Sequence, residues 1–126
     1  MDGSATPETD FPVVHSRGVV VPRDPAVMTP KLRRALRLNG YEAKEVDAAL
    51  KCVTDGDTVL ELGGGIGFVS TLLAKKRNVK AIHTYEANPH LIQFQDQMHR
   101  LNNVTTVKTH NALLGPRKGK PQSFYV

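Results

Sequence analysis

A run of glycines with an acidic residue on either side is the part of this sequence best suited to chemistry. Residues 59–70 read VLELGGGIGFVS, so an apolar segment leads into four glycines and then into a second apolar segment. This order predicts a strand, a tight turn and a helix. Glycine permits positive φ and carries no β-carbon, so a ligand can lie against bare backbone at the carboxyl end of the strand. We therefore predict a binding site at Gly63, Gly65 and Gly67.

An acidic residue follows the glycines at the spacing that is typical of nucleotide-binding sites. Glu86 comes nineteen residues after Gly67 and ends another apolar segment. An acid at the end of the second strand of such a unit can accept hydrogen bonds from both hydroxyls of a ribose. The alternative is an ordinary solvated loop acid. The pair of features predicts a cofactor that contains a ribose, either a dinucleotide or S-adenosylmethionine.

The acid ahead of the glycines distinguishes these two cofactors. The dinucleotide pattern G-x-G-x-x-G fails from Gly63, because Phe68 takes the third position, and from Gly65 it ends on Ser70. Glu61 stands two residues before Gly63, where its charge would repel a pyrophosphate and attract the ammonium group of a methionine moiety. The pattern favours S-adenosylmethionine.

The segments that would position these residues alternate between strand and helix, which is typical of a parallel α/β sheet. We predict strands over residues 58–62, 80–85 and 104–108, helices over 67–77 and 89–101, and the start of a fourth strand over 123–126. The predicted fold class is therefore α/β, a Rossmann-like parallel sheet truncated after about three strands. We assign residues 55–126 to this partial domain.

Residues 1–54 are predicted to lead into the domain. Four prolines between residues 12 and 30 favour an extended segment and disfavour a helix there. Thr29 can cap a helix that begins at Pro30, and the spacing of apolar residues predicts a second helix over residues 42–53.

Taken together, these motifs resemble those of class I S-adenosylmethionine-dependent methyltransferases. Residues 59–70 resemble their motif I, and residues 85–89 (YEANP) resemble their acidic motif II. More narrowly, SRGV at 16–19, GYE at 40–42 with Glu45, the glycine loop, EANP and HNAL at 110–113 resemble the FkbM family in the same order. The resemblance covers residues 16–126.

The resemblance implies a role for each matching position. The methionine and ribose would be lined by Gly63, Gly65 and Gly67, with Glu61 near the amino group and Glu86 on the ribose hydroxyls. The adenine would be flanked by Ala87 and Asn88 and met from the other side by Asn111 and Ala112. The methionine end would be closed over by Tyr41 and Glu42. Plainer roles remain open for several of them. Asn88 is a candidate helix cap, Asn111 a turn residue, and the Tyr41–Glu42 pair a helix start.

The implied function is that of an S-adenosylmethionine-dependent methyltransferase, with O-methyl transfer to a small molecule or sugar. Such a domain has about seven strands, so this chain would be the cofactor-binding half, and no catalytic base can be named in it. We expect it to be inactive alone. Because the strand over 58–62 would lack one neighbour, we also expect self-association through that sheet edge.

Two other functions remain open. The chain carries nine basic and four acidic residues over positions 56–126, against eight of each over positions 1–55, and this excess is the one hint of an RNA or DNA methyltransferase. The other alternative is a non-catalytic binding module that keeps the fold as a scaffold.

Composition bears on whether the protein is membrane-bound, secreted, disulfide-bonded or metal-binding. No apolar run approaches the roughly 20 residues of a membrane span, and the first ten residues do not resemble a secretory signal, so we expect a cytoplasmic protein. A single cysteine excludes an internal disulfide, and we predict that Cys52 is a small buried residue. The five histidines show no metal-binding spacing, so we expect no metal site.

Overall fold

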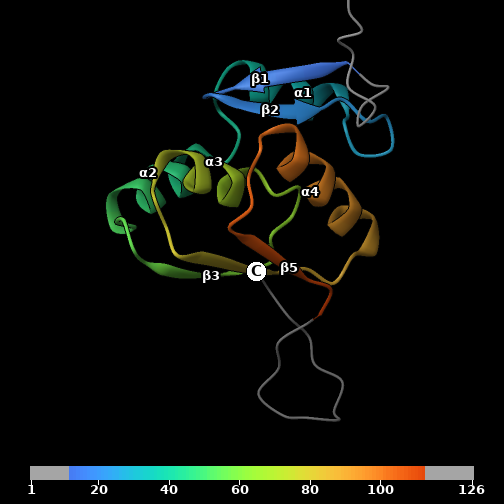
Figure 1. Ribbon diagram of the computed structural model, residues 1–126. Coiled ribbons are helices and arrows are strands. Elements are labelled where there is room, and N and C mark those ends of the chain that lie inside the picture. The colour runs from blue at the N-terminus through green and yellow to red at the C-terminus, as the bar shows by residue number, and fades with distance from the viewer. Residues whose placement is uncertain (1–11, 113–126) are drawn as a thin grey trace, which may run out of the picture.

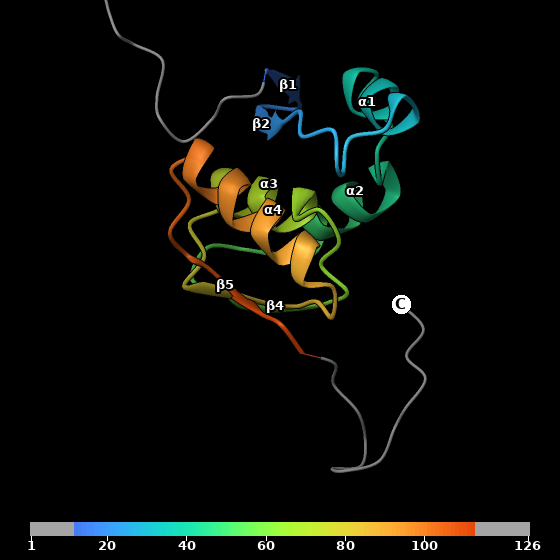
Figure 2. The ribbon, with the colours of Figure 1, turned by 90° about the vertical axis from the view of Figure 1, so that its right-hand side faces the viewer.

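The computed structural model describes residues 12–112, which fold into three layers (Figure 1). A two-stranded hairpin with helix α1 forms one outer layer, helices α2, α3 and α4 form the middle, and a three-stranded sheet forms the other outer layer. Figure 2 shows the same order after a quarter turn, with α3 and α4 between the hairpin and the sheet. The strand expected over 123–126 lies outside the described residues.

The sheet has the parallel arrangement that the sequence predicts. It consists of β3 (Thr58–Leu62), β4 (Ala81–Tyr85) and β5 (Val107–His110) in the order β3-β4-β5. Leu62 pairs with Tyr85, and Tyr85 pairs with His110, so the three carboxyl ends meet at one edge. That edge holds the glycine loop and the segments after β4 and β5.

The helices pack on one face of the sheet. They are α2 (Ala43–Cys52), α3 (Phe68–Lys76) and α4 (Pro89–Leu101). Their bounds agree with the predicted helices to within one residue. Asn88 caps α4 as predicted, because its Oδ1 accepts the His90 N–H at 2.9 Å. On the opposite face of the sheet, Leu60 and Leu62 of the edge strand are 61% and 43% exposed.

The segment expected to be a simple extended lead-in is a β-hairpin. Strands β1 (Val13–Ser16) and β2 (Val19–Pro22) pair antiparallel through a two-residue turn. Arg17 and Gly18 both have positive φ, 51° and 85°, as a type I′ turn requires. Arginine is an unusual first residue for such a turn, which is why the sequence did not indicate it. Helix α1 (Pro30–Arg37) follows, and the Thr29 hydroxyl caps it as predicted.

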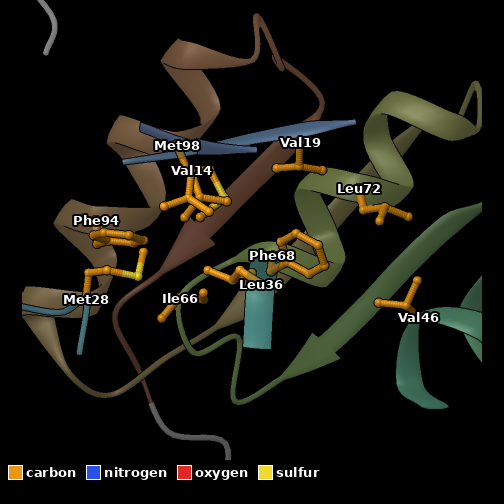
Figure 3. Close-up of a cluster of buried hydrophobic side chains, with 11 residues drawn as sticks. Val14, Val19, Met28, Leu36, Val46, Ile66, Phe68, Leu72, Phe94 and Met98 are labelled. Carbon is orange, nitrogen blue, oxygen red and sulfur yellow. The ribbon is translucent and has the colours of Figure 1, made fainter. Parts of the chain in front are cut away.

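The larger hydrophobic core lies between the hairpin layer and the helical layer (Figure 3). Valines of the hairpin meet Phe94 and Met98 of α4 and Phe68 and Leu72 of α3. A smaller cluster of Leu73, Val79 and Ile82 joins α3 to the sheet. The hairpin therefore holds α3 and α4 against the sheet from behind, and these helices in turn position the loops that begin them.

One buried side chain joins the hairpin to the end of α4. The Asn102 amide nitrogen donates to the carbonyls of Val20 and Met98, each at 2.7 Å. Its Oδ1 accepts the Val20 N–H at 2.8 Å. Asn102 was expected only to end the helix; it also binds a strand 82 residues earlier in the chain.

Two local predictions were wrong. The third strand begins at Val107 and not at residue 104, because the Val104 N–H donates to the His99 carbonyl at 2.9 Å and closes the end of α4. Cys52 is exposed, since the last turn of α2 directs it away from the core that Val46 enters.

Candidate cofactor site

The glycine loop connects the end of β3 to the start of α3. Gly63, Gly65 and Gly67 have φ of 69°, 59° and 90°, a region that residues with a β-carbon seldom adopt. The N–H groups of Gly63 and Gly64 both donate to the Tyr85 carbonyl, at 2.8 and 3.2 Å. The loop therefore turns back over the end of β4, which brings its backbone beside Glu86.

The glycines of the loop have different reasons to lack a side chain. A β-carbon on Gly64 would collide with the Thr84 hydroxyl, and one on Gly67 would lie 2.8 Å from Cγ of Gln95. A β-carbon on Gly65 would meet nothing within 4 Å. Gly64, which the sequence analysis did not include, serves packing. Gly65 instead presents open backbone, as a ligand surface requires.

Gln95 is the residue of this region that sequence reasoning missed. It is fully buried on α4, and its Nε2 donates to the Gly65 carbonyl at 2.6 Å. This bond fixes the middle of the loop to a helix thirty residues further along the chain. In the sequence, the one sign of a role for Gln95 is its position among the apolar residues of α4, and this position indicates only that the side chain is buried.

Glu86 lies at the centre of the site. Its Oε1 accepts the Gly65 N–H at 2.9 Å, and its Oε2 accepts the Asn88 N–H at 3.0 Å. The carboxylate is thus held between the glycine loop and the start of α4. Each oxygen keeps lone-pair capacity for one further donor, so two hydroxyls of a ribose can still be accepted.

The segment after β5 lies against Glu86. Asn111 Nδ2 donates to the carbonyls of Glu86 and Ala87, each at 3.0 Å. The Ala112 N–H donates to the Glu86 carbonyl at 3.1 Å. Ala87, Asn88, Asn111 and Ala112 are all exposed and form the rim of the edge beside Glu86.

Glu61 lies beneath the loop in a strongly desolvated position. Thr84 donates to its Oε1 at 2.8 Å. Burial raises the pKa of Glu61 above its usual value, and the charges of Glu42 and Glu86 raise it further, while hydrogen bonds from Thr84 and Ser70 lower it. No cationic side chain of the described residues forms an ion pair with Glu61. A cation from a ligand would therefore meet an uncompensated carboxylate.

Tyr41 and Glu42 lie near the same carboxylate. The Tyr41 ring packs edge-on against Phe68, the first residue of α3, with the ring centroids 5.6 Å apart. Burial, and then the charges of Glu42 and Glu61, raises the pKa of Tyr41 to about 12. Glu42 has a φ of 47° and makes no capping bond, so this side chain is free at the start of α2.

The arrangement gives the site two chemically distinct ends. One end, at Glu61 with Glu42 close by, attracts a cation. The other end, at Glu86 and the rim beside it, offers acceptors and exposed backbone to a ribose and a flat ring. A pyrophosphate on the loop would face several carboxylates, which disfavours a dinucleotide.

Among residues 12–112, no group of three metal-ligating side chains lies together. His83 Nδ1 and His110 Nε2 are 3.1 Å apart on the face of the sheet opposite the described helices, and His110 stacks on Tyr85. No helix in the described part of the chain is long and apolar enough to span a bilayer.

Comparison with known proteins places the fold among Rossmann-like methyltransferases. No protein-family model and no curated protein sequence matches the chain. Solved structures do match. The chain is similar to Trm5b from Pyrococcus abyssi, at 25% identity over 88% of this chain and 30% of that one, with a TM-score of 0.59.

Two further structures agree. TYW2 from M. jannaschii, solved in complex with AdoMet, is 19% identical over 80% of this chain and 42% of that one, with a TM-score of 0.62. Coclaurine N-methyltransferase bound to SAH is 23% identical over 60% of this chain and 23% of that one, with a TM-score of 0.53. The chain thus spans less than half the length of the structures it matches. The narrower resemblance to FkbM stays a prediction.

Proposed function

We propose that this chain binds S-adenosylmethionine at the carboxyl edge of its sheet and is the cofactor-binding part of a methyltransferase. The observation that carries the proposal is Glu61, a desolvated carboxylate beneath an open glycine loop without a cationic partner among the described residues. Similarity to TYW2 in complex with AdoMet supports the same ligand.

The described residues fit this cofactor at each of its ends. Glu61, with Glu42 near it, would hold the methionine ammonium group. Glu86, already oriented by the N–H groups of Gly65 and Asn88, would accept the ribose hydroxyls. Ala87, Asn88, Asn111 and Ala112 would border the adenine, as the resemblance implies.

When bound, the sulfonium group supplies an activated methyl donor, so the protein has little chemistry to perform beyond positioning. Within residues 12–112 the residues of the site bind and orient the cofactor. We assign no proton acceptor among the described residues.

Two acceptor classes are compatible with this site. The resemblance to FkbM implies O-methyl transfer to a small molecule or sugar. A nucleic-acid acceptor is the second candidate, and a specific observation favours it, namely that Arg23, Arg33 and Arg37 line one cavity. The alternative of a non-catalytic binding module would have the same cofactor site but would transfer no methyl group.

Calorimetric titration with S-adenosylmethionine and with NAD tests the proposal. We expect saturable binding of the first ligand and none of the second. Because an ammonium group favours ionised Glu61, binding should release a proton, and affinity should rise with pH above the usual carboxyl pKa. Glu61→Gln should weaken binding about 10- to 100-fold and remove this pH dependence. Binding of NAD alone would overturn the proposal.

The same substitution has a predictable effect on the free protein. The folded-state pKa of Glu61 is raised, so its favourable contribution to stability is complete below the unfolded pKa and is lost as pH rises through the folded value. Glu61→Gln keeps an acceptor for Thr84 and removes the buried charge. The thermal midpoint of the unliganded variant at neutral pH should therefore equal or exceed that of the parent.

We also propose that the chain self-associates through its sheet. Among the described residues β3 has one neighbour, and Leu60 and Leu62 are exposed beside its open edge. Light scattering should show species larger than a monomer, and Leu60→Lys with Leu62→Lys should reduce them. A monodisperse monomer of the parent chain would contradict this.

A further inference from the structure

A basic cavity lies between strand β1 and helix α1, away from the cofactor site. Its volume is about 330 Å³, within the range of ligand pockets. Its walls are formed by Val13, Val14, His15, Arg23, Arg33 and Arg37. It belongs to the hairpin layer, which the helices separate from the sheet (Figures 1 and 2). Three of its six lining residues are therefore arginines.

These arginines are not used to hold the fold together. Arg33 and Arg37 are one turn apart on α1, and Arg23 follows β2. None of their guanidinium groups forms an ion pair or hydrogen bond within the described chain, from residue 12 to 112. By contrast, Arg17 pairs with Asp47 at 3.0 Å, and Arg77 donates to backbone carbonyls of Leu50 and Val53.

The surroundings of the cavity add to its positive charge. Residues 12–41 contain six Lys and Arg residues and a single acid, Asp24. That acid accepts the Ala26 N–H at 2.9 Å. Lys31 and Arg34 are exposed elsewhere on α1, which has no acidic residue. Of these cations Arg17 has a partner, Asp47. The three arginines of the cavity have none among the described residues, and like charges without counter-charges repel one another, so this arrangement favours an external anion.

We infer that the cavity between β1 and α1, on a helix that also carries the exposed Lys31 and Arg34, binds the phosphates of a nucleic-acid strand. The planar guanidinium fork matches phosphate oxygens in a bidentate geometry that a lysine cannot provide. Where the proposed function holds, this assigns the methyl acceptor to nucleic acids and not to small molecules. The binding itself does not depend on that function.

The extent of the charged surface decides between possible anions. A helix of eight residues is about 12 Å long, and successive phosphates of a stacked strand rise about 3.4 Å, so α1 can contact several phosphates of one strand. A single phosphate group would leave most of these cations without a partner. The flat surface of an anionic membrane would not enter the cavity.

Fluorescence anisotropy of a labelled 20-nucleotide single-stranded RNA, titrated with the full chain over a range of salt concentrations, tests the inference. Each phosphate contact contributes about −0.7 to the slope of log K against log salt for a single strand. Arg33→Gln with Arg37→Gln should weaken binding about tenfold at moderate salt and reduce the slope by about 1.4. The same double variant should also bind a single-stranded DNA of equal length more weakly than the parent chain does.

A matched control is available on α2. Lys44→Gln with Lys51→Gln removes the same charge from exposed positions outside the cavity and should change affinity less than twofold. The inference fails if both double variants lose affinity equally, since the effect would then come from net charge alone. It also fails if inorganic phosphate binds as tightly as the RNA strand. A third contrary result is that the chain binds phosphatidylserine vesicles but binds neither the RNA nor the DNA strand.

The two proposals can fail separately. Neither guanidinium group makes an ion pair or hydrogen bond within the described chain, so the Arg33→Gln, Arg37→Gln variant should fold and should bind S-adenosylmethionine like the parent. Conversely, Glu86→Ala should leave RNA affinity within twofold. Loss of RNA binding with normal cofactor binding, only in the arginine variant, is the result that supports a separate phosphate-binding cavity.

Discussion

Glu86→Ala is expected to weaken S-adenosylmethionine binding by about 2 to 4 kcal/mol, or roughly 30-fold to 1000-fold. The substitution would remove the acceptor of both ribose hydroxyls. Sequence reasoning alone predicts almost no change in stability. The structure predicts a loss of about 1 kcal/mol, because the N–H groups of Gly65 and Asn88 would lose their acceptor and turn to water. Calorimetry and thermal unfolding measure the two effects.

Two further variants separate the causes. Glu86→Gln keeps one acceptor oxygen and should lose less affinity than the alanine variant. Asp55→Ala is the matched control, because Asp55 accepts the Asn78 N–H at 2.8 Å near the opposite, amino-terminal edge of the sheet. It should lower stability by a similar amount and leave cofactor affinity unchanged. Unchanged affinity in Glu86→Ala would exclude Glu86 from the site.

Gly65→Ala is expected to reduce cofactor affinity at least about 100-fold while the protein stays folded. Its β-carbon would meet no protein atom within 4 Å, so the cost to the free protein is the positive φ of 59°, about 1 to 2 kcal/mol. The methyl group would project from the backbone over which we place the ligand. Calorimetric titration of the variant measures the loss.

Gly56→Ala is a close control for this variant. Gly56 has a φ of 86°, its β-carbon would also meet nothing within 4 Å, and it lies in the turn before β3. The two variants should lose similar stability, and only Gly65→Ala should lose affinity. Equal cofactor affinity in both would show that the ligand does not lie on Gly65.

The sequence predicted the parts of this fold that depend on short-range signals. Thr29 and Asn88 are confirmed as helix caps, since each side chain bonds a backbone N–H two or three residues ahead. The glycines predict the turn because their positive φ is a local property. The parallel order of the strands followed from the alternation of strand and helix along the chain.

What the sequence could not predict depends on contacts between distant residues. Gln95 of α4 donates a hydrogen bond to the glycine loop, and a glutamine at this position in the sequence does not indicate such a contact. The charge balance of the first 55 residues, eight basic against eight acidic, concealed the arginine cavity. Folding brings Arg23 beside Arg33 and Arg37, while Asp24 turns to its own backbone.

The bond between Asn102 and Val20 also bears on how the chain folds as it is synthesised. The hairpin leaves the ribosome before α4, but its valines are buried by Phe94 and Met98, and its backbone is bound by Asn102. Closing a loop of 82 residues is slow compared with forming a local hairpin. Until residue 102 has emerged, the nascent chain must expose that apolar face, which makes this interval the stage at which chaperone binding matters most.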